Sequence, residues 1–439
     1  MKSPAFIKRL FAPAATTGSK PDRHTRRTVA LCRALLSERG EASGAALARA
    51  ALEAYRLLAG PGLKAFFDVL AREFSPDPEA VEEAAGAYRQ DASQANLIRL
   101  QNVVEPPRQE LFRRLNLADG GTAALVEMRR RLLRDLRAQP QWAGIDADLA
   151  HLLSSWFNRG FLSLQRIDWR TPALVLEKLM HYEAVHEIQG WHDLRRRLES
   201  DRRCFAFFHP ALPDEPIIFI EVALTKGMSD EVQPLLDPDS PVVDAAGADT
   251  AIFYSITNCQ EGLRGISFCN FLIKQVAGDL GREFPRLKTF ATLSPIPGFR
   301  KWLAETAAAH AELDEFVGAL AAEDWLERAG PGSRMRTELM RLCAYYLQHA
   351  KHDQDPVDAV ARFHLGNGAR MERLNWRADS SKTGLARSAG LMVNYVYRLK
   401  DVERNHEAYA KEHHVVASPG LALLARESLV ARLKVKRRG

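Results

Sequence analysis

The segment from residue 250 to residue 293 restricts the fold of this chain more than any other. It contains a strand-like run, "TAIFYSIT" (250–257), a loop with glycine, an amphipathic stretch over 268–284 and a second strand-like run, "LKTFATL" (287–293). Two strands joined by a helix normally lie in one sheet with a right-handed crossover between them. The segment therefore predicts a strand–loop–helix–strand unit.

Further strand-like runs begin only after about residue 160. They are "RRCFAFFH" (202–209), "PIIFIEVAL" (216–224) and, much later, "GLMVNYVYRL" (390–399). A helical insertion is predicted from 300 to about 363, broken at "GPG" (330–332) and at Pro356. Residues 159–439 are thus expected to form one sheet-containing domain.

The chain before this point has a helical pattern. In "TAALVEMRRRLLRDL", Leu125, Met128, Leu132 and Leu136 share one face, and Arg129, Arg130 and Arg134 lie elsewhere on the helix. Glycine and proline breaks at 60–62, 75–78, 105–107 and 139–141 predict five or six helices of bundle length. We expect residues 26–158 to be a separate helical domain that serves oligomerisation or packing.

Charge and cysteine content limit the functions open to the chain. The net charge is +6, but residues 1–30 and 430–439 carry +6 and +5, so residues 31–429 are acidic at about −5. Residues 1–25 are expected to be a basic flexible tail, and its composition leaves an organelle transit peptide open as an alternative.

Five scattered cysteines without a CxxC spacing predict neither disulfides nor zinc and indicate a cytoplasmic protein. No nucleic-acid partner is expected, because the excess positive charge lies only in the two ends of the chain. No membrane partner is expected, because no apolar run reaches the roughly 20 residues that a membrane helix needs.

The loop "NCQEGLRGIS" (258–267) is the first candidate binding element. A glycine-containing turn before a helix presents backbone amides and the positive end of the helix dipole, which suit a phosphate or pyrophosphate. The same glycines also occur in such turns for steric reasons alone, and both readings stay open at this point.

His364 is the second candidate. The stretch "DPVDAVARFHLGNGA" (355–369) predicts a short helix with Asp355 as N-cap, Pro356 at its first position and Gly366 just past its end. His364 falls on the apolar stripe of this helix, so it is either a hydrogen-bonded core residue or a proton donor. Its position in the last turn favours the imidazolium form. The other histidines lack partners at metal-ligand spacing, and no metal site is expected.

Ser294 is the third candidate. It stands at the end of a predicted strand in "ATLSPIPGFRKWL" (291–303), directly before Pro295 and Pro297. Proline fixes φ and lacks an amide donor, so we expect a stiff loop that neither continues the sheet nor starts a helix early.

Several of these segments together resemble malonyl-CoA decarboxylases. The resemblance lies in "HPALPDEPIIFIEVALTKG" (209–227), "AIFYSITNCQEGLRGISFCNFLIKQV" (251–276), "FATLSPIPGFRKWL" (290–303), "FHLGNGARMERLNWRAD" (363–379) and "GLMVNYVYRL" (390–399). These segments follow the order and spacing of the family, and the chain resembles a bacterial member. The resemblance implies an N-terminal helical bundle followed by a GNAT-like, acyl-CoA-binding catalytic domain with a mixed central sheet.

The resemblance also implies the site residues. It places the CoA-contacting stretch on Arg264, Gly265, Ile266, Ser267, Phe268, Cys269 and Asn270, the proton donor on His364 and its acceptor partner on Ser294. Asn367 and Tyr397 are secondary candidates for the same site. Ser267 and Cys269 stand where the acyl-CoA loop of GNAT enzymes has small glycine-type residues, so this loop departs from the usual pattern.

The implied reaction converts malonyl-CoA to acetyl-CoA and CO₂ without a cofactor, because the thioester itself accepts the electron pair as an enolate. The protein then has to orient the substrate, stabilise the enolate and deliver a proton. Two alternatives remain: an N- or O-acyltransferase, which would require an acyl acceptor, and a non-catalytic helical interaction protein, which would show no turnover. A homo-oligomer formed through the helical domain is expected.

Overall fold

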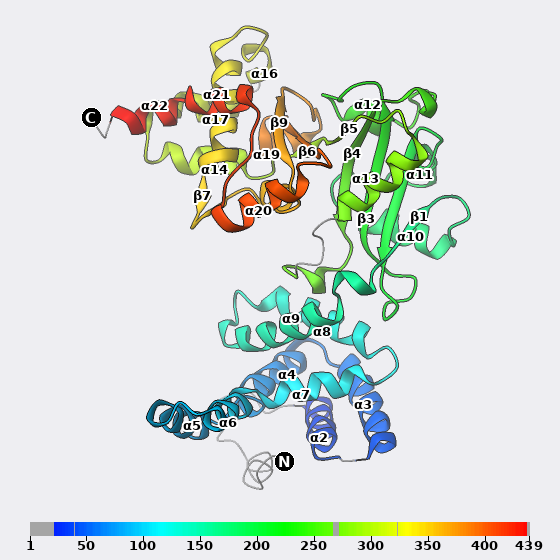
Figure 1. Cartoon of the computed structure of the whole chain (residues 1–439), viewed down its shortest axis with the longest axis vertical. Helices are drawn as coiled ribbons and strands as arrows, with labels where there is room; N and C mark the ends of the chain where they lie inside the picture. The colour runs from blue at the N-terminus through cyan, green and yellow to red at the C-terminus, as the bar shows by residue number, and fades with distance from the viewer. Residues whose placement is uncertain (1–21, 39, 267–271, 323, 437–439) are drawn as a thin grey trace. The chain divides into compact units, whose positions relative to one another are not determined.

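The structure is a computed structural model that describes residues 22–38, 40–266, 272–322 and 324–436 (Figure 1). These residues divide into two compact units. The first contains residues up to 163 together with the segments 208–215 and 260–266, and the second contains most of the remainder. In the described part of the chain, no helix combines the length and the apolar character needed to cross a membrane.

The first unit is helical. Within residues 22–163, where position 39 is not described, it has eight α-helices rather than the five or six predicted. Three further breaks separate the helices: one follows Asn116, next to the pair Gly120–Gly121, and two follow Ser37 and Gln90, where no proline or paired glycine marks the sequence. Asp22 and Ser93 cap the helices that follow by accepting hydrogen bonds from the backbone amides of Thr25 (2.7 Å) and Asn96 (3.4 Å). The helices are α2 (Arg23–Ser37), α3 (Glu41–Arg56), α4 (Gly60–Glu73), α5 (Pro78–Gln90), α6 (Gln94–Val104), α7 (Pro107–Asn116), α8 (Gly121–Asp135) and α9 (Ala143–Trp156).

The apolar face predicted for helix α8 is largely confirmed. Leu125, Met128 and Leu132 are buried, and Leu136 is partly buried. One polar residue differs from the prediction. Arg129, expected away from the apolar face, is only 4% exposed. A buried guanidinium requires specific partners, which are described below.

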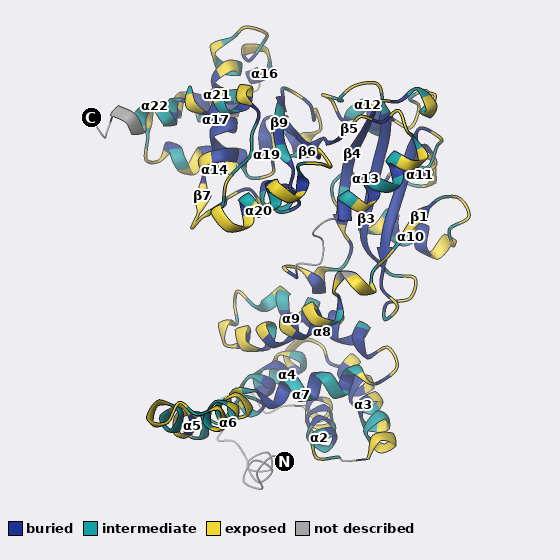
Figure 2. Cartoon of the chain, in the orientation of Figure 1, coloured by how far each residue is buried: buried dark blue, intermediate teal, exposed yellow. Residues whose placement is uncertain are grey.

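The second unit is built on a mixed sheet with the strand order β1-β2-β3-β4-β5-β10-β6, in which β9 pairs with the outer side of β10. The central strands are almost wholly buried (Figure 2). The sequence predicted five of these strands but not β1, β6 or β9. The strands are β1 (Ser163–Ile167), β2 (Arg202–Phe208), β3 (Pro216–Thr225), β4 (Thr250–Asn258), β5 (Thr289–Thr292), β6 (Ser294–Pro295), β9 (Arg370–Asn375) and β10 (Met392–Val396), with β7 (Lys351–His352) and β8 (Asp355–Pro356) in a separate hairpin.

The predicted strand–helix–strand unit is confirmed. Strands β4 and β5 are parallel, and helix α13 (Leu272–Glu283) lies between them in sequence. Their pairing ends at Phe253 and Thr292, after which β4 continues along β3 as far as Asn258. Beyond this point β5 no longer pairs with β4, and the chain after β5 continues to Ser294. The carboxyl ends of the two strands therefore separate, which leaves the edge of β4 on that side without β5 as a partner.

Helices connect and flank the sheet. The helical insertion is confirmed and contains α14 (Phe299–Ala307), α15 (Asp314–Ala321), α16 (Trp325–Arg328) and α17 (Arg334–His349), with position 323 not described. The remaining α-helices of the second unit are α10 (Ala173–Tyr182), α11 (Trp191–Arg197), α12 (Gln233–Leu236), α18 (Ala359–Gly366), α19 (Lys382–Ser388), α20 (Val402–Glu412), α21 (Pro419–Arg426) and α22 (Leu429–Lys436).

Candidate active site

Ser294 lies in the sheet rather than in a loop. It forms the two-residue strand β6 with Pro295, and it pairs with Val393 of the antiparallel strand β10. The prediction that the prolines end the sheet directly after Ser294 is therefore wrong, because a proline can occupy an edge position whose missing amide is not needed by the ladder. Pro297 does begin the turn before helix α14. The side chain of Ser294 is consequently fixed on a buried part of the backbone, with 5% of the residue exposed.

His364 lies in the last turn of helix α18, as predicted, but the helix begins later than expected. Its N-cap is Asp358, which accepts a hydrogen bond from the amide of Ala361 (2.8 Å), whereas Asp355 and Pro356 form strand β8. A proline at 356 suits this short extended segment as well as it suits a first helical turn. The imidazole is buried and stacks on the ring of Tyr395, with 4.4 Å between centroids and 26° between planes.

The structure brings Ser294, His364 and Tyr397 into one hydrogen-bonded chain. The Ser294 Oγ lies 3.0 Å from His364 Nε2, and the Tyr397 hydroxyl lies 2.7 Å from His364 Nδ1. Ser294 uses its only hydrogen on Thr292 Oγ1, at 2.8 Å. Ser294 must therefore accept from Nε2–H, and the Tyr397 hydroxyl must donate to Nδ1. This order assigns the Nε2–H tautomer to neutral His364.

Burial sets the charge of this site. It lowers the pKa of His364 from 6.5 to about 3, so the imidazole is neutral near pH 7 in this structure. The expectation of an imidazolium favoured by the helix end is therefore wrong here. A helix C-terminus supplies about 0.3–1 kcal/mol to a nearby cation, whereas a shift from 6.5 to about 3 corresponds to about 5 kcal/mol. Burial also raises the pKa of Tyr397 well above its ordinary value, which keeps the hydroxyl protonated.

The other predicted site residues lie in different settings. Asn367 is buried at the C-terminal end of helix α18, where its side-chain amide donates to the carbonyl of Phe363 (2.8 Å). Arg264, Gly265 and Ile266 form a turn in the first unit, after the short 3₁₀ helix η4 (Glu261–Leu263). Ser267, Phe268, Cys269 and Asn270 lie outside the described residues.

Sequence reasoning missed two neighbours of the Ser294–His364 pair, Thr292 and Tyr395. Thr292 Oγ1 accepts from Ser294 and also from the backbone amide of Tyr395 (3.2 Å), which fixes the threonine in place. Strand periodicity could have suggested both, because side chains two residues apart point to the same face. Thr292 precedes Ser294 by two positions, and Tyr395 precedes Tyr397 by two.

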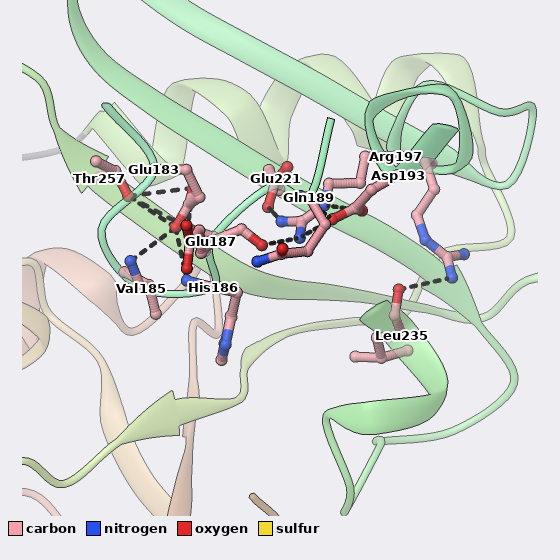
Figure 3. A network of polar contacts seen from close by, with 12 residues as sticks. Glu183, Val185, His186, Glu187, Gln189, Asp193, Arg197, Glu221, Leu235 and Thr257 are labelled. Carbon is pink, nitrogen blue, oxygen red and sulfur yellow. Dashed lines mark hydrogen bonds and ion pairs between the residues drawn. The ribbon is translucent and has the colours of Figure 1, made fainter. Parts of the chain in front are cut away.

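A second buried polar network lies against strands β3 and β4 (Figure 3). The carboxylate of Glu183 accepts from the hydroxyls of Ser255 (2.8 Å) and Thr257 (3.3 Å) on β4. Further along, Arg197 of helix α11 donates to Asp193 (2.7 Å) and Glu221 (2.8 Å). Burial raises the pKa of Glu221 to about 8 even beside this guanidinium. The network ties α11 and the segment after α10 to the sheet.

Comparisons with known proteins match both parts of the chain. The family model of the malonyl-CoA decarboxylase C-terminal domain matches residues 160–435, and that of the N-terminal domain matches residues 74–157. The mitochondrial malonyl-CoA decarboxylase of the goose Anser anser anser is 37% identical over 387 residues, which cover 80% of this chain and 77% of that protein. The mitochondrial malonyl-CoA decarboxylase of Mus musculus is 36% identical, with coverage of 80% and 79%.

Solved structures agree with these matches. The crystal structure of malonyl-CoA decarboxylase from Rhodopseudomonas palustris has a TM-score of 0.86 and 49% identity, and it covers 90% of this chain and 98% of its own. The structure of malonyl-CoA decarboxylase from Agrobacterium vitis has a TM-score of 0.84 at the same identity and coverage. The chain has a helical region followed by a mixed-sheet catalytic domain, and these relatives are malonyl-CoA decarboxylases. Together they identify the chain as a carboxy-lyase. The chain belongs to the malonyl-CoA decarboxylase family.

Proposed function

We propose that the protein converts malonyl-CoA to acetyl-CoA and CO₂, with His364 as the proton donor and Ser294 as its partner. The observation that carries the proposal is the buried chain Tyr397–His364–Ser294, with its contacts of 2.7 and 3.0 Å. It supports a role in proton transfer, because a buried histidine bonded at both ring nitrogens is held in one orientation and one tautomer.

The reaction needs one proton and no electron acceptor other than the substrate. The bond between the central malonyl carbon and its carboxylate breaks, and the electron pair moves into the thioester as an enolate while CO₂ leaves. The central carbon then takes one proton, which gives acetyl-CoA. His364 supplies this proton in the proposal, and solvent restores it afterwards.

The neutral state of His364 is compatible with these reaction steps if the bound substrate brings a negative charge into the site. A negative charge close to an imidazole favours the protonated form and raises its pKa. The malonyl carboxylate, and then the enolate oxygen, would therefore counteract the burial that holds the pKa near 3. Ser294 would turn its one hydroxyl hydrogen from Thr292 to the carboxylate or the enolate, and Tyr397 would keep the ring in place.

Incubation of the purified protein with malonyl-CoA, without added metal, tests the activity. We expect one acetyl-CoA for each malonyl-CoA consumed. A requirement for an acyl acceptor, with release of free CoA, would indicate the acyltransferase alternative, and the absence of turnover would contradict the proposal.

Substitutions at the two residues test their roles. We expect His364→Ala and Ser294→Ala each to lower kcat by about two orders of magnitude, the usual scale for a general acid or an enolate donor. The controls are His352→Ala and Ser380→Ala, because both side chains are exposed in the same unit. A rate within a few-fold of the unsubstituted protein in either active-site variant would remove that residue from the mechanism.

We also propose a homo-oligomer formed through the helical unit. Helix α6 buries none of its residues within the chain, although Ile98 and Val104 are apolar and 48% and 46% exposed. A second copy is the partner that this proposal assigns to α6, because an apolar helix face is stabilised when it is covered.

We propose a cytoplasmic location for the protein. The absence of a disulfide pattern among its five cysteines supports a reducing compartment. Fractionation of the cells that make the protein tests this location, and recovery in an organelle or an exported fraction would contradict it.

A further inference from the structure

The turn that follows helix η4 has the geometry of a type II β-turn. The amide of Ile266 donates to the carbonyl of Leu263 (3.1 Å). Arg264, at the second position, has φ −56° and ψ 131°, and Gly265, at the third, has φ +80°. A positive φ at this position is the reason that a type II turn requires glycine. The geometry explains why glycine occupies position 265.

The two ends of the turn are buried and its middle is exposed. Leu263 and Ile266 lie in the core of the first unit, whereas Arg264 and Gly265 face solvent. In a trans peptide the carbonyl and the amide point in opposite directions. The carbonyl of Arg264 is directed toward Arg129 of helix α8, so the amide of Gly265 is directed away from that helix. The turn thus presents a guanidinium and a backbone amide together, a combination that suits an anion.

Arg129 holds this turn. Its Nη1 donates to the carbonyls of Gly262 and Arg264, both at 2.8 Å, and its Nε donates to Asp146 Oδ1, also at 2.8 Å. The side chain is 5% exposed. One buried guanidinium therefore connects helices α8 and α9 to the backbone of the turn.

Gly262 allows the close approach that these bonds require. A Cβ at this position would lie 2.0 Å from the carbonyl oxygen of Val126 in helix α8, closer than any side chain could tolerate. The backbone before the turn therefore rests directly on the backbone of α8, and Arg129 of the same helix fixes its carbonyls.

We propose that Arg129 is a positioning residue for substrate binding: it fixes the turn Leu263–Ile266 in the conformation that presents Arg264 and the Gly265 amide to the phosphate groups of the CoA thioester. The inference rests on the proposed function, which assigns a CoA substrate to this loop.

A matched pair of arginine-to-lysine variants tests the inference. Arg129→Lys keeps a charge beside Asp146 but loses the fork that reaches two carbonyls. The control is Arg108→Lys: Arg108 is equally buried in the same unit and bonded to Asp148 and to Ser75 (2.6 Å), and its hydrogen-bond partners are not part of the turn. Each variant is assayed with malonyl-CoA and with malonyl-pantetheine, which carries the same reacting group without the nucleotide and its phosphates.

We expect Arg129→Lys to raise KM for malonyl-CoA about tenfold, as for the loss of one hydrogen bond to a charged group, with little change in kcat. Its kcat/KM for malonyl-pantetheine should stay that of the unsubstituted protein. Arg108→Lys should not change the preference between the two substrates. Gly265→Ala should show the same selective loss as Arg129→Lys, because alanine is strained at φ +80° although nothing lies within 4 Å of its Cβ. This second variant alters the turn without touching the helical core.

Three results would overturn the inference while leaving the proposed function in place. An equal loss for both substrates in Arg129→Lys, as in Arg108→Lys, would mean that Arg129 is only structural. Unchanged kinetics in both Arg129→Lys and Gly265→Ala would mean that the turn does not contact the substrate. If the unsubstituted protein turns over malonyl-CoA without preferring it to malonyl-pantetheine, the inference fails while the proposed function stands. Absence of turnover with either substrate would contradict the proposed function itself, and the inference with it.

Discussion

The side chain of His364 lies where two local influences oppose each other. The carbonyls at the end of helix α18 favour a positive charge, and the surrounding core disfavours it. Burial dominates, and it lowers the pKa to about 3. The imidazole of the free protein is therefore neutral, and the proposed proton delivery would follow a change made by substrate binding.

The low pKa of His364 predicts a pH dependence of stability. Between pH 6.5 and about 3 the unfolded chain binds a proton at this histidine that the folded chain does not bind. The free energy of unfolding should therefore fall as the pH falls below 6.5, by about 1.4 kcal/mol per pH unit from this group. Urea unfolding of the unsubstituted protein and of His364→Gln, at pH 7 and at pH 5, measures the difference.

The His364→Gln variant should lose less stability on acidification than the unsubstituted protein, because the contributions of all other groups cancel in the comparison. The control is His352→Gln, the same substitution at a histidine whose side chain is 86% exposed. Parallel pH curves for the unsubstituted protein and His364→Gln would show that His364 is not held neutral by burial.

At the scale of elements, helix α11 is attached to the sheet by charge rather than by apolar contact alone. Arg197 is 2% exposed and bonds Asp193 in its own helix and Glu221 on strand β3, whose side chain is wholly buried (Figure 3). A buried guanidinium needs hydrogen-bonded partners, and removal of Arg197 would leave the buried oxygens of Asp193 and Glu221 without their donor.

We therefore predict that Arg197→Met lowers the free energy of unfolding by about 3–5 kcal/mol. Chemical denaturation measures this loss. The control is Arg195→Met, two residues earlier in the same helix, where the guanidinium is exposed and stacks 5.4 Å from the ring centroid of Trp169; a loss below about 1 kcal/mol is expected there. Equal losses in the two variants would contradict a special role for the buried network.

At the scale of the whole molecule, the proposed assembly predicts a particular mass in solution. The chain has a mass of 49.1 kDa, so light scattering after size-exclusion chromatography should give at least twice this value. Ile98→Glu should shift the mass toward that of one chain, because it places a charge on the apolar face of α6. Val242→Glu, in the second unit at a residue that is 47% exposed, is the control and should leave the mass unchanged. A single-chain mass for the unsubstituted protein would contradict the proposal.

Much of the architecture could be predicted from local patterns. The strand–helix–strand unit, the apolar face of α8 and the helical insertion all follow from spacings of two to four residues, which fix the neighbours within one element. The break after α5 escaped prediction because it depends on the single capping residue Ser93, and the break after α2 because no proline or paired glycine marks it. Strands β1, β6 and β9 escaped prediction because they are short or half-polar. Local patterns made Ser294 and His364 candidates, and the resemblance to a known family assigned their roles in one site.

The sequence by itself determined five strands of the sheet and most of the helical segments, and it supplied Ser294 and His364 as candidates for acid–base chemistry. Only the tertiary structure decided the state of those side chains. The pairing of Ser294 with β10, the neutral imidazole of His364 and the burial of Arg129 against a distant turn all depend on contacts between residues far apart in the chain. Local spacing carries no information about such partners, because desolvation and hydrogen bonding are set by whatever the folded chain places around a group.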